Sequence, residues 1–141
     1  MCERMVATLP AIVKRKVPTF TGRRCLVMGL GVHGGGVSVA RWLWRQGAQL
    51  CVTDLQPVSR LRPSIAKLPK SARLRLVLGR HRAADVRWAD VVVRNPAVPQ
   101  SSPYLVLARQ LRKQVENEAT MFFQLVGSDR IVGVTGTRGK S

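Results

Sequence analysis

The sequence predicts an α/β fold with a Rossmann-like, mostly parallel sheet flanked by helices. Three observations support this prediction. Short apolar runs alternate with stretches of helical periodicity, a glycine-rich loop directly follows the first apolar run, and 45% of the 141 residues are hydrophobic, which is enough for one core. No apolar run approaches the roughly 18 residues that cross a bilayer, so we expect a soluble, cytoplasmic protein.

The expected elements follow one another along the chain. The first strand covers 25–30, and the helix after it places Val37, Ala40 and Leu43 on one face at spacings of three and four. The second strand, 49–53, completes a βαβ unit of about 30 residues. Further strands are expected at 74–78, 90–94, near Val115 and at 131–135, and further helices at 58–68, 104–113, opened by Pro103, and 119–126.

The composition divides the chain into three parts. We expect a basic leader over residues 1–22, the Rossmann-like domain over 23–126, and a linker with the first strand of a further domain over 127–141. The best linker candidate is Gly127-Ser128-Asp129-Arg130, because small and polar residues of this kind favour a loop.

The formal net charge of +17, from 24 Lys and Arg against 7 Asp and Glu, is typical of a nucleic-acid-binding protein. The basic residues are spread in short blocks with few aromatic residues between them, which favours a solvated, Arg-rich surface. Neither the three cysteines nor the two histidines have metal-ligand spacing. We therefore expect no zinc site, and we expect Cys25 and Cys51 to be buried, reduced thiols on neighbouring strands.

A glycine loop, Gly29-Leu30-Gly31-Val32-His33-Gly34, follows the first strand and opens the first helix. In this setting glycine allows a tight turn, and backbone N–H groups at the helix N-terminus can bind a diphosphate. Asp54 ends the second strand about 20 residues later, where an acidic side chain can bind a nucleotide's ribose or base. Taken alone, this pattern suggests NAD. The alternatives are a purely structural turn for the loop and a turn cap for Asp54.

A third loop, Asn95-Pro96-Ala97-Val98-Pro99, follows the fourth strand. The carboxyl ends of parallel strands meet at one edge of a sheet, so this loop is expected beside the glycine loop and Asp54. Its two prolines fix a rigid loop that could line a ligand crevice. An ordinary strand-ending turn explains the same residues equally well.

The most specific segment is the last one. The apolar run 131–135 leads into Gly136-Thr137-Arg138-Gly139-Lys140-Ser141. In loops of this kind backbone N–H groups hold phosphates, the lysine reaches the β- and γ-phosphates, and the serine hydroxyl ligates Mg²⁺. Val134 stands where the generic P-loop has its first glycine, so the generic pattern is not fully met.

The loop at 136–141 resembles the ATP loop of the Mur ligase family, whose usual form, G-T-N-G-K-[ST], needs no glycine at position 134 and has Asn in place of Arg138. The other three loops resemble the N-terminal domain of the family's D-glutamate-adding branch, which has Ser-Pro-Gly in place of Asn95-Pro96-Ala97. Four loops in this order, over residues 23–141, are more specific than any one of them. The alanine-adding branch fits less well, because its first loop is usually richer in glycine.

The resemblance implies a UDP-sugar site and an ATP site. It assigns the diphosphate to Gly29, Gly31, Val32, His33 and Gly34, the uracil to Asp54, and the sugar to Asn95, Pro96 and Ala97. It assigns ATP to the residues Gly136, Thr137, Arg138, Gly139, Lys140 and Ser141, and Mg²⁺ to Ser141.

In the family's reaction, ATP phosphorylates the carboxylate of UDP-N-acetylmuramoyl-L-alanine, and the amine of D-glutamate attacks the acyl phosphate, in peptidoglycan precursor synthesis. The resemblance further implies that the chain stops at the truncated start of a P-loop ATPase domain. We therefore expect a monomeric N-terminal fragment that binds UDP-sugar, has no catalytic residue of its own, binds no specific nucleic acid and does not ligate.

Two rival functions are an NAD-binding module of an oxidoreductase or sensor and a basic nucleic-acid-binding domain, whose affinity would fall steeply with salt. The first leaves the loop at 136–141 unexplained. The second explains the charge but none of the four loops.

Overall fold

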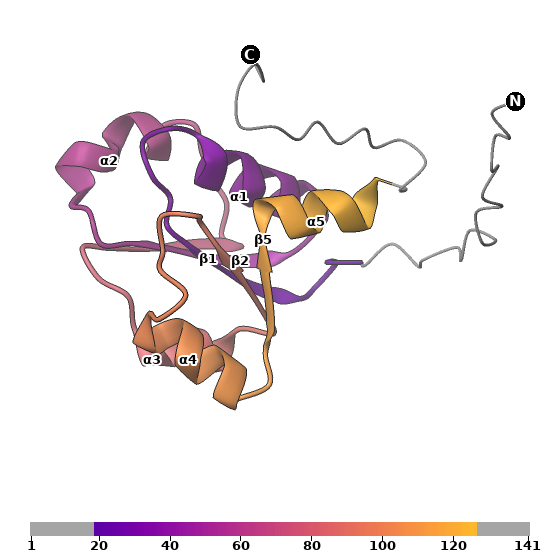
Figure 1. Cartoon of the computed structure of the whole chain (residues 1–141). Coiled ribbons are helices and arrows are strands. Elements are labelled where there is room, and N and C mark those ends of the chain that lie inside the picture. The colour runs from indigo at the N-terminus through magenta and orange to yellow at the C-terminus, as the bar shows by residue number, and fades with distance from the viewer. Residues whose placement is uncertain (1–18, 127–141) are drawn as a thin grey trace, which may run out of the picture.

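The computed structural model describes residues 19–126, in which strands and helices alternate (Figure 1). The strands are β1 (Arg24–Met28), β2 (Gln49–Asp54), β3 (Leu74–Leu78), β4 (Val91–Arg94) and β5 (Gln114–Asn117). The helices are α1 (Gly35–Arg45), α2 (Val58–Ile65), α3 (Ala83–Trp88), α4 (Pro103–Gln110) and α5 (Glu118–Leu125). The expected strand at 131–135 lies outside the described residues.

All the neighbouring strands of this sheet are parallel, in the order β3-β2-β1-β4-β5. Met28 at the end of β1 pairs with Thr53 on β2 and with Arg94 on β4, so the three central strands end level with one another. Strand β2 pairs with β1 on one side, and β4 pairs with β1 on the other side. The direction in which successive strands are added to the sheet therefore reverses at β1. This reversal is the place where open α/β sheets form a ligand crevice, and the predicted α/β fold is confirmed.

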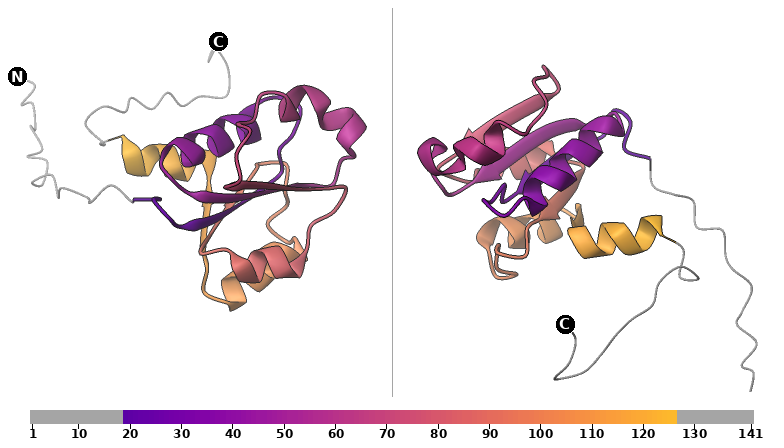
Figure 2. Two further views of the ribbon diagram at one scale, coloured as in Figure 1. Left: turned by 180° about the vertical axis from the view of Figure 1, so that it is seen from behind. Right: turned by 90° about the horizontal axis from the view of Figure 1, so that it is seen from above.

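Two layers of helices cover the sheet (Figures 1 and 2). Alternate strand residues face opposite layers: Val27 and Val52 belong to the core beneath α1, α2 and α5, while Leu26 and Cys51 belong to the core beneath α3 and α4. Cys25 and Cys51 are both buried and free, as predicted, and burial raises the pKa of the Cys25 thiol to about 12.

Several element boundaries differ from the prediction. Helix α3 was not predicted, because its six residues are too few to establish a helical period. Helix α4 ends at Gln110 rather than at Lys113, and Arg112 takes a positive φ of 53° that no helix continues through. Phe20, from the segment predicted as the leader, is buried and packs edge-on against Trp42.

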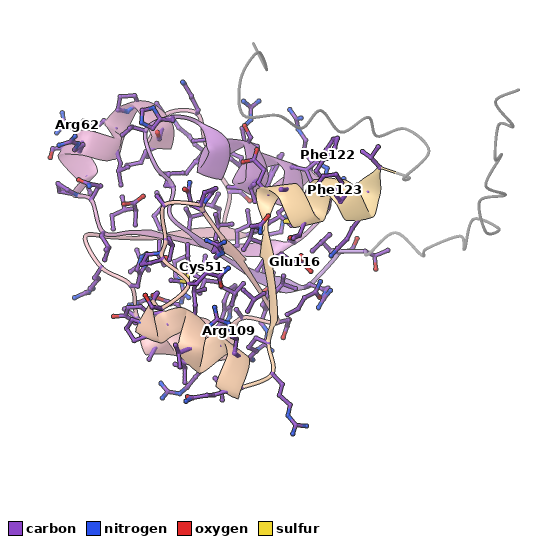
Figure 3. The ribbon with its side chains drawn as sticks, in the orientation of Figure 1. Cys51, Arg62, Arg109, Glu116, Phe122 and Phe123 are labelled. Carbon is purple, nitrogen blue, oxygen red and sulfur yellow. The ribbon has the colours of Figure 1, made fainter. Side chains whose placement is uncertain are left out.

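The basic side chains lie on both helical layers. Arg62 on α2 and Arg109 on α4 stand on opposite sides of the sheet (Figure 3). This distribution matches a solvated basic surface better than a single nucleic-acid-binding stripe. Within residues 19–126, no helix is long and apolar enough to span a bilayer.

Candidate functional site

A cavity of about 710 Å³ opens at the carboxyl edge of the sheet. Its walls come from the loops that follow β1, β2 and β4 and from the start of α4. Every residue that the sequence assigned to a UDP-sugar is among the residues lining it: Gly29, Gly31, Val32, His33, Gly34, Asp54, Asn95, Pro96 and Ala97. The fold thus brings three separate loops to one cavity.

The glycine loop needs glycine because the backbone passes very close to its neighbours. A Cβ atom on Gly29, whose φ is 91°, would lie 2.7 Å from Cβ of Asn95. A Cβ atom on Gly36 would collide with the carbonyl oxygens of Gly29 and Leu30. The close approach at Gly29 joins the glycine loop to the loop after β4. The close approach at Gly36 lets α1 start directly above the end of β1.

Three side chains from other elements fix the glycine loop. The Asp54 carboxylate accepts a hydrogen bond from the N–H of Gly31 at 2.8 Å, and its other oxygen accepts one from the N–H of Gln56, also at 2.8 Å. The Ser64 hydroxyl donates to the carbonyl of Gly31 at 2.7 Å, and the Asn95 amide donates to that of Gly29 at 3.3 Å. Asp54 therefore acts as a turn cap and as an anchor of the loop, while still lining the cavity.

The N-terminus of α1 faces this cavity without a side-chain cap. Gly34 precedes the helix with a φ of 94°, no side chain of the described chain caps it by a hydrogen bond, and its first turn has no acidic residue. Uncapped N–H groups and the helix dipole favour an anion at this position. Among the residues lining the cavity, Arg60 is the single Lys or Arg.

The loop after β4 keeps its shape through its own hydrogen bonds. The N–H of Ala97 donates to the Asn95 side chain at 3.0 Å, and the Arg94 guanidinium donates to the carbonyl of Val98 at 3.0 Å. Pro96 and Pro99 line the cavity beside them. This rigid, mostly apolar wall faces the glycine loop.

Sequence reasoning missed several residues that line the cavity, among them Arg60, His81, Tyr104 and Glu118. They come from α2, the β3–α3 connection, α4 and α5, and no motif links them in the sequence. His81 was considered only as a metal ligand. A signal was nevertheless present, because His81 follows the third predicted strand and so belongs to the same sheet edge.

His81 is 8% exposed, and its Nδ1 lies 2.8 Å from the Thr53 hydroxyl oxygen. The Tyr104 ring meets it edge-on, with ring centres 5.5 Å apart. Burial lowers the pKa of His81, and the nearby Asp54 carboxylate only partly opposes this effect. Over the described range 19–126, no group of three or more His, Cys, Asp or Glu side chains could hold a metal ion.

Comparison with known proteins identifies the family. The family model described as Mur ligase MurD-like, N-terminal domain, matches residues 23–116, which is most of the described chain. The chain belongs to the MurD-like Mur ligases. The resemblance drawn from the four loops is therefore confirmed at the level of the family.

Relatives of this MurD-like domain carry the name UDP-N-acetylmuramoylalanine--D-glutamate ligase. The one from Roseiflexus sp. (strain RS-1) is 53% identical over 85% of this chain, and the one from Borreliella afzelii (strain PKo) is 44% identical over 82%. The corresponding protein of Treponema pallidum (strain Nichols) is 37% identical over 85%. The chain spans only about a quarter of the length of these relatives, at 25%, 25% and 23%.

Solved structures agree on the fold of the MurD-like domain. A pseudomurein peptide ligase type C from Methanothermus fervidus matches 68% of this chain and 19% of its own with a TM-score of 0.51 and 18% identity. The dehydroquinate dehydratase and shikimate dehydrogenase portion of AroM from S. pombe matches 76% of this chain and 26% of its own, again with a TM-score of 0.51, at 13% identity. At such identities the likeness concerns the fold alone.

Proposed function

We propose that this chain is the UDP-sugar-binding part of a ligase that adds D-glutamate to UDP-N-acetylmuramoyl-L-alanine. The observation that carries this proposal is the single cavity at the carboxyl edge of the sheet, lined by all nine residues that the family resemblance assigns to the UDP-sugar. Membership of the MurD-like family and relatives named as this ligase support it.

The proposed ligand lies along the cavity with its diphosphate at the start of α1. There the uncapped N–H groups of the glycine loop donate to the phosphate oxygens, and Arg60 adds a positive charge. Asp54 binds the uracil, because each carboxylate oxygen accepts one backbone N–H and keeps a further lone pair. The sugar lies along the wall formed by Asn95, Pro96 and Ala97.

The ligase reaction that we propose for the whole enzyme uses ATP and Mg²⁺ to form an acyl phosphate, which the amine of D-glutamate then attacks. Metal and positive charge stabilise the transferring phosphoryl group in reactions of this class. The residues predicted to bind ATP and Mg²⁺, 136–141, lie outside the described residues, and their roles stay predictions. A monomeric state, a place in the cytoplasm and a role in cell-wall synthesis belong to the same proposal.

Calorimetric titration of the 141-residue chain tests the proposal. The ligands are UDP-N-acetylmuramoyl-L-alanine, NAD and a mixed-sequence DNA duplex, each at two salt concentrations. We expect saturable binding of the UDP-sugar, weakened at least about 10-fold in Asp54→Asn, since a buried polar contact to the ligand would be lost. Asp90→Asn is the matched control, because Asp90 pairs with Arg24 and is absent from the cavity lining.

The other two ligands separate the rival functions. Saturable binding of NAD without UDP-sugar binding would favour a dinucleotide-binding module. Binding of DNA alone, with an affinity that falls steeply as salt rises, would favour a nucleic-acid-binding protein. Either result would overturn the proposal.

A further inference from the structure

His81 stands at the edge of the cavity in a fixed position. The residue before it, Arg80, forms an isolated bridge with Asp54, which places the β3–α3 connection beside the end of β2. The Thr53 hydroxyl lies against one ring nitrogen, and the edge of Tyr104 packs against the ring. Because Thr53 holds one ring nitrogen and Tyr104 packs against the ring, the imidazole has little freedom to turn.

The second ring nitrogen, Nε2, has no hydrogen-bond partner in the part of the chain that the structure describes. It is not among the polar atoms that are closed off from solvent, so it is open to the cavity. His81 is more than nine-tenths buried, and it lines the cavity. A ligand atom that reaches Nε2 in the cavity gains a hydrogen bond that the protein itself does not fill. The nitrogen is thus an unused binding group beside the proposed nucleotide site.

We propose that His81 is a base-specificity residue, whose Nε2–H donates a hydrogen bond to the 4-carbonyl oxygen of the uracil that Asp54 holds. This inference rests on the proposed function. It adds a second polar contact between the protein and the nucleobase. It also explains how the site selects uracil over cytosine.

The chemistry of the base decides which ring nitrogen carries the proton. The imide N–H of uracil is flanked by two carbonyl oxygens, so a group beside Asp54, which accepts from that N–H, has to be a donor. Nε2 is then protonated, and Nδ1 accepts the hydrogen of the Thr53 hydroxyl. Burial lowers the pKa of His81, which favours the neutral ring with a single N–H.

Cytosine reverses this pattern. Its ring nitrogen at the same place is an acceptor that faces the Asp54 carboxylate, and its amino group is a donor that faces Nε2–H. Both contacts would then be repulsive, and a site that leaves polar groups unpaired discriminates strongly. The pair of Asp54 and His81 thus distinguishes the two pyrimidines.

Binding of UDP and CDP to the 141-residue chain tests the inference, with wild type, His81→Phe and Thr53→Val compared by calorimetry. His81→Phe keeps a planar ring and removes Nε2. We expect it to lower the affinity for UDP by about 5-fold, within the range of one lost hydrogen bond, and to raise the affinity for CDP slightly, because a donor that faces the cytosine amino group is removed. Thr53→Val should give a smaller loss in the same direction, because the ring loses the group that orients it.

A second measurement needs no substitution. Nitrogen-15 NMR of the histidine rings should show His81 neutral and protonated at Nε2, with a shift of that signal when UDP binds. The inference fails if UDP binds to the wild type while His81→Phe, folded as judged by circular dichroism, keeps the same ratio of UDP to CDP affinity. It also fails if Nε2 is unprotonated in the UDP complex. Absence of UDP binding by the wild type would instead overturn the proposed function, and this inference with it.

Discussion

Two buried aspartates, Asp54 at the end of β2 and Asp85 on α3, have opposite surroundings. Asp85, 1% exposed, forms ion pairs with Arg75 at 2.8 Å and Arg82 at 2.7 Å. Burial raises the pKa of Asp85, but the two arginines outweigh this effect, and the net shift is downward. Asp54, 6% exposed, has no salt-bridge partner within the described chain, accepts two backbone N–H groups and lines the cavity.

The charge of Asp85 stabilises the fold, whereas the charge of Asp54 is available to a ligand. Guanidinium groups donate three hydrogen bonds to the Asp85 carboxylate, which is buried beside them. Backbone N–H groups fix the orientation of Asp54 while leaving lone pairs free. Substitutions at the two regions should therefore affect stability and binding in different proportions.

The largest effect is expected at the start of α1, where the helix packs against the glycine loop. Gly36→Ala should lower the free energy of unfolding by about 3 kcal/mol, because the new methyl group meets backbone carbonyls that cannot move aside. Gly34→Ala is the matched control: it meets no atom within 4 Å and suffers only from its positive φ, at about 1 kcal/mol. Urea unfolding measures both, and equal losses would show that crowding plays no part.

The second largest effect is expected from removing the buried charge of Asp85 on α3. Asp85→Asn is expected to cost about 2 kcal/mol, since it weakens charge-assisted hydrogen bonds to two arginines. Its Kd for UDP-N-acetylmuramoyl-L-alanine should stay within about 2-fold of wild type, because Asp85 is absent from the cavity lining. Urea unfolding and calorimetry test the two parts, and a large loss of binding would remove the distinction between the two aspartates.

Ser64→Ala sharpens the comparison on the cavity side. It removes the hydroxyl that donates to Gly31, so we expect a loss of about 1 kcal/mol in unfolding free energy, together with weaker UDP-sugar binding. Ser59→Ala, an exposed position on the same helix, should stay within about 0.5 kcal/mol. The same thermal or urea unfolding series measures both variants, and indistinguishable results would contradict a role for Ser64 in fixing the loop.

The smallest effect concerns acid stability. Hydrogen bonds from Arg24 lower the pKa of Asp90 from its usual 3.8 to about 2. The folded state therefore binds this proton less readily than the unfolded state, and the stabilisation is complete above about pH 4 and is lost as the pH falls toward 2. The difference in unfolding free energy between wild type and Asp90→Asn should shrink over that interval. A difference that does not change with pH would contradict the pairing.

Much of the fold was predictable because its signals are local. Strands β1 to β4 contain short apolar runs, and Pro103 does open α4. The order of the strands was not predicted, since pairing depends on contacts between distant residues. The short α3 and the end of α4 at Gln110, shortly before the positive φ of Arg112, depend on local geometry that leaves little trace in hydrophobic periodicity.

The site was predictable where motifs follow strands directly. The glycine loop, Asp54 and the loop from Asn95 were each found from the strand before them, and the fold brings them together. Arg60 and Tyr104 belong to no motif, and only the packing of α2 and α4 around the sheet edge places them at the cavity, whereas His81 could have been expected there because it follows β3. The dual position of Asp54, as anchor and as cavity residue, also required the three-dimensional arrangement.

Amide NMR of the uniformly labelled chain, titrated with UDP-N-acetylmuramoyl-L-alanine, tests the central claim most directly. The account predicts saturable shifts concentrated on 29–36, 54–56 and 95–97, with little change on α3 around Asp85. Shifts spread over the basic outer surfaces of α2 and α4, or no shifts at all, would contradict binding at the carboxyl edge of the sheet.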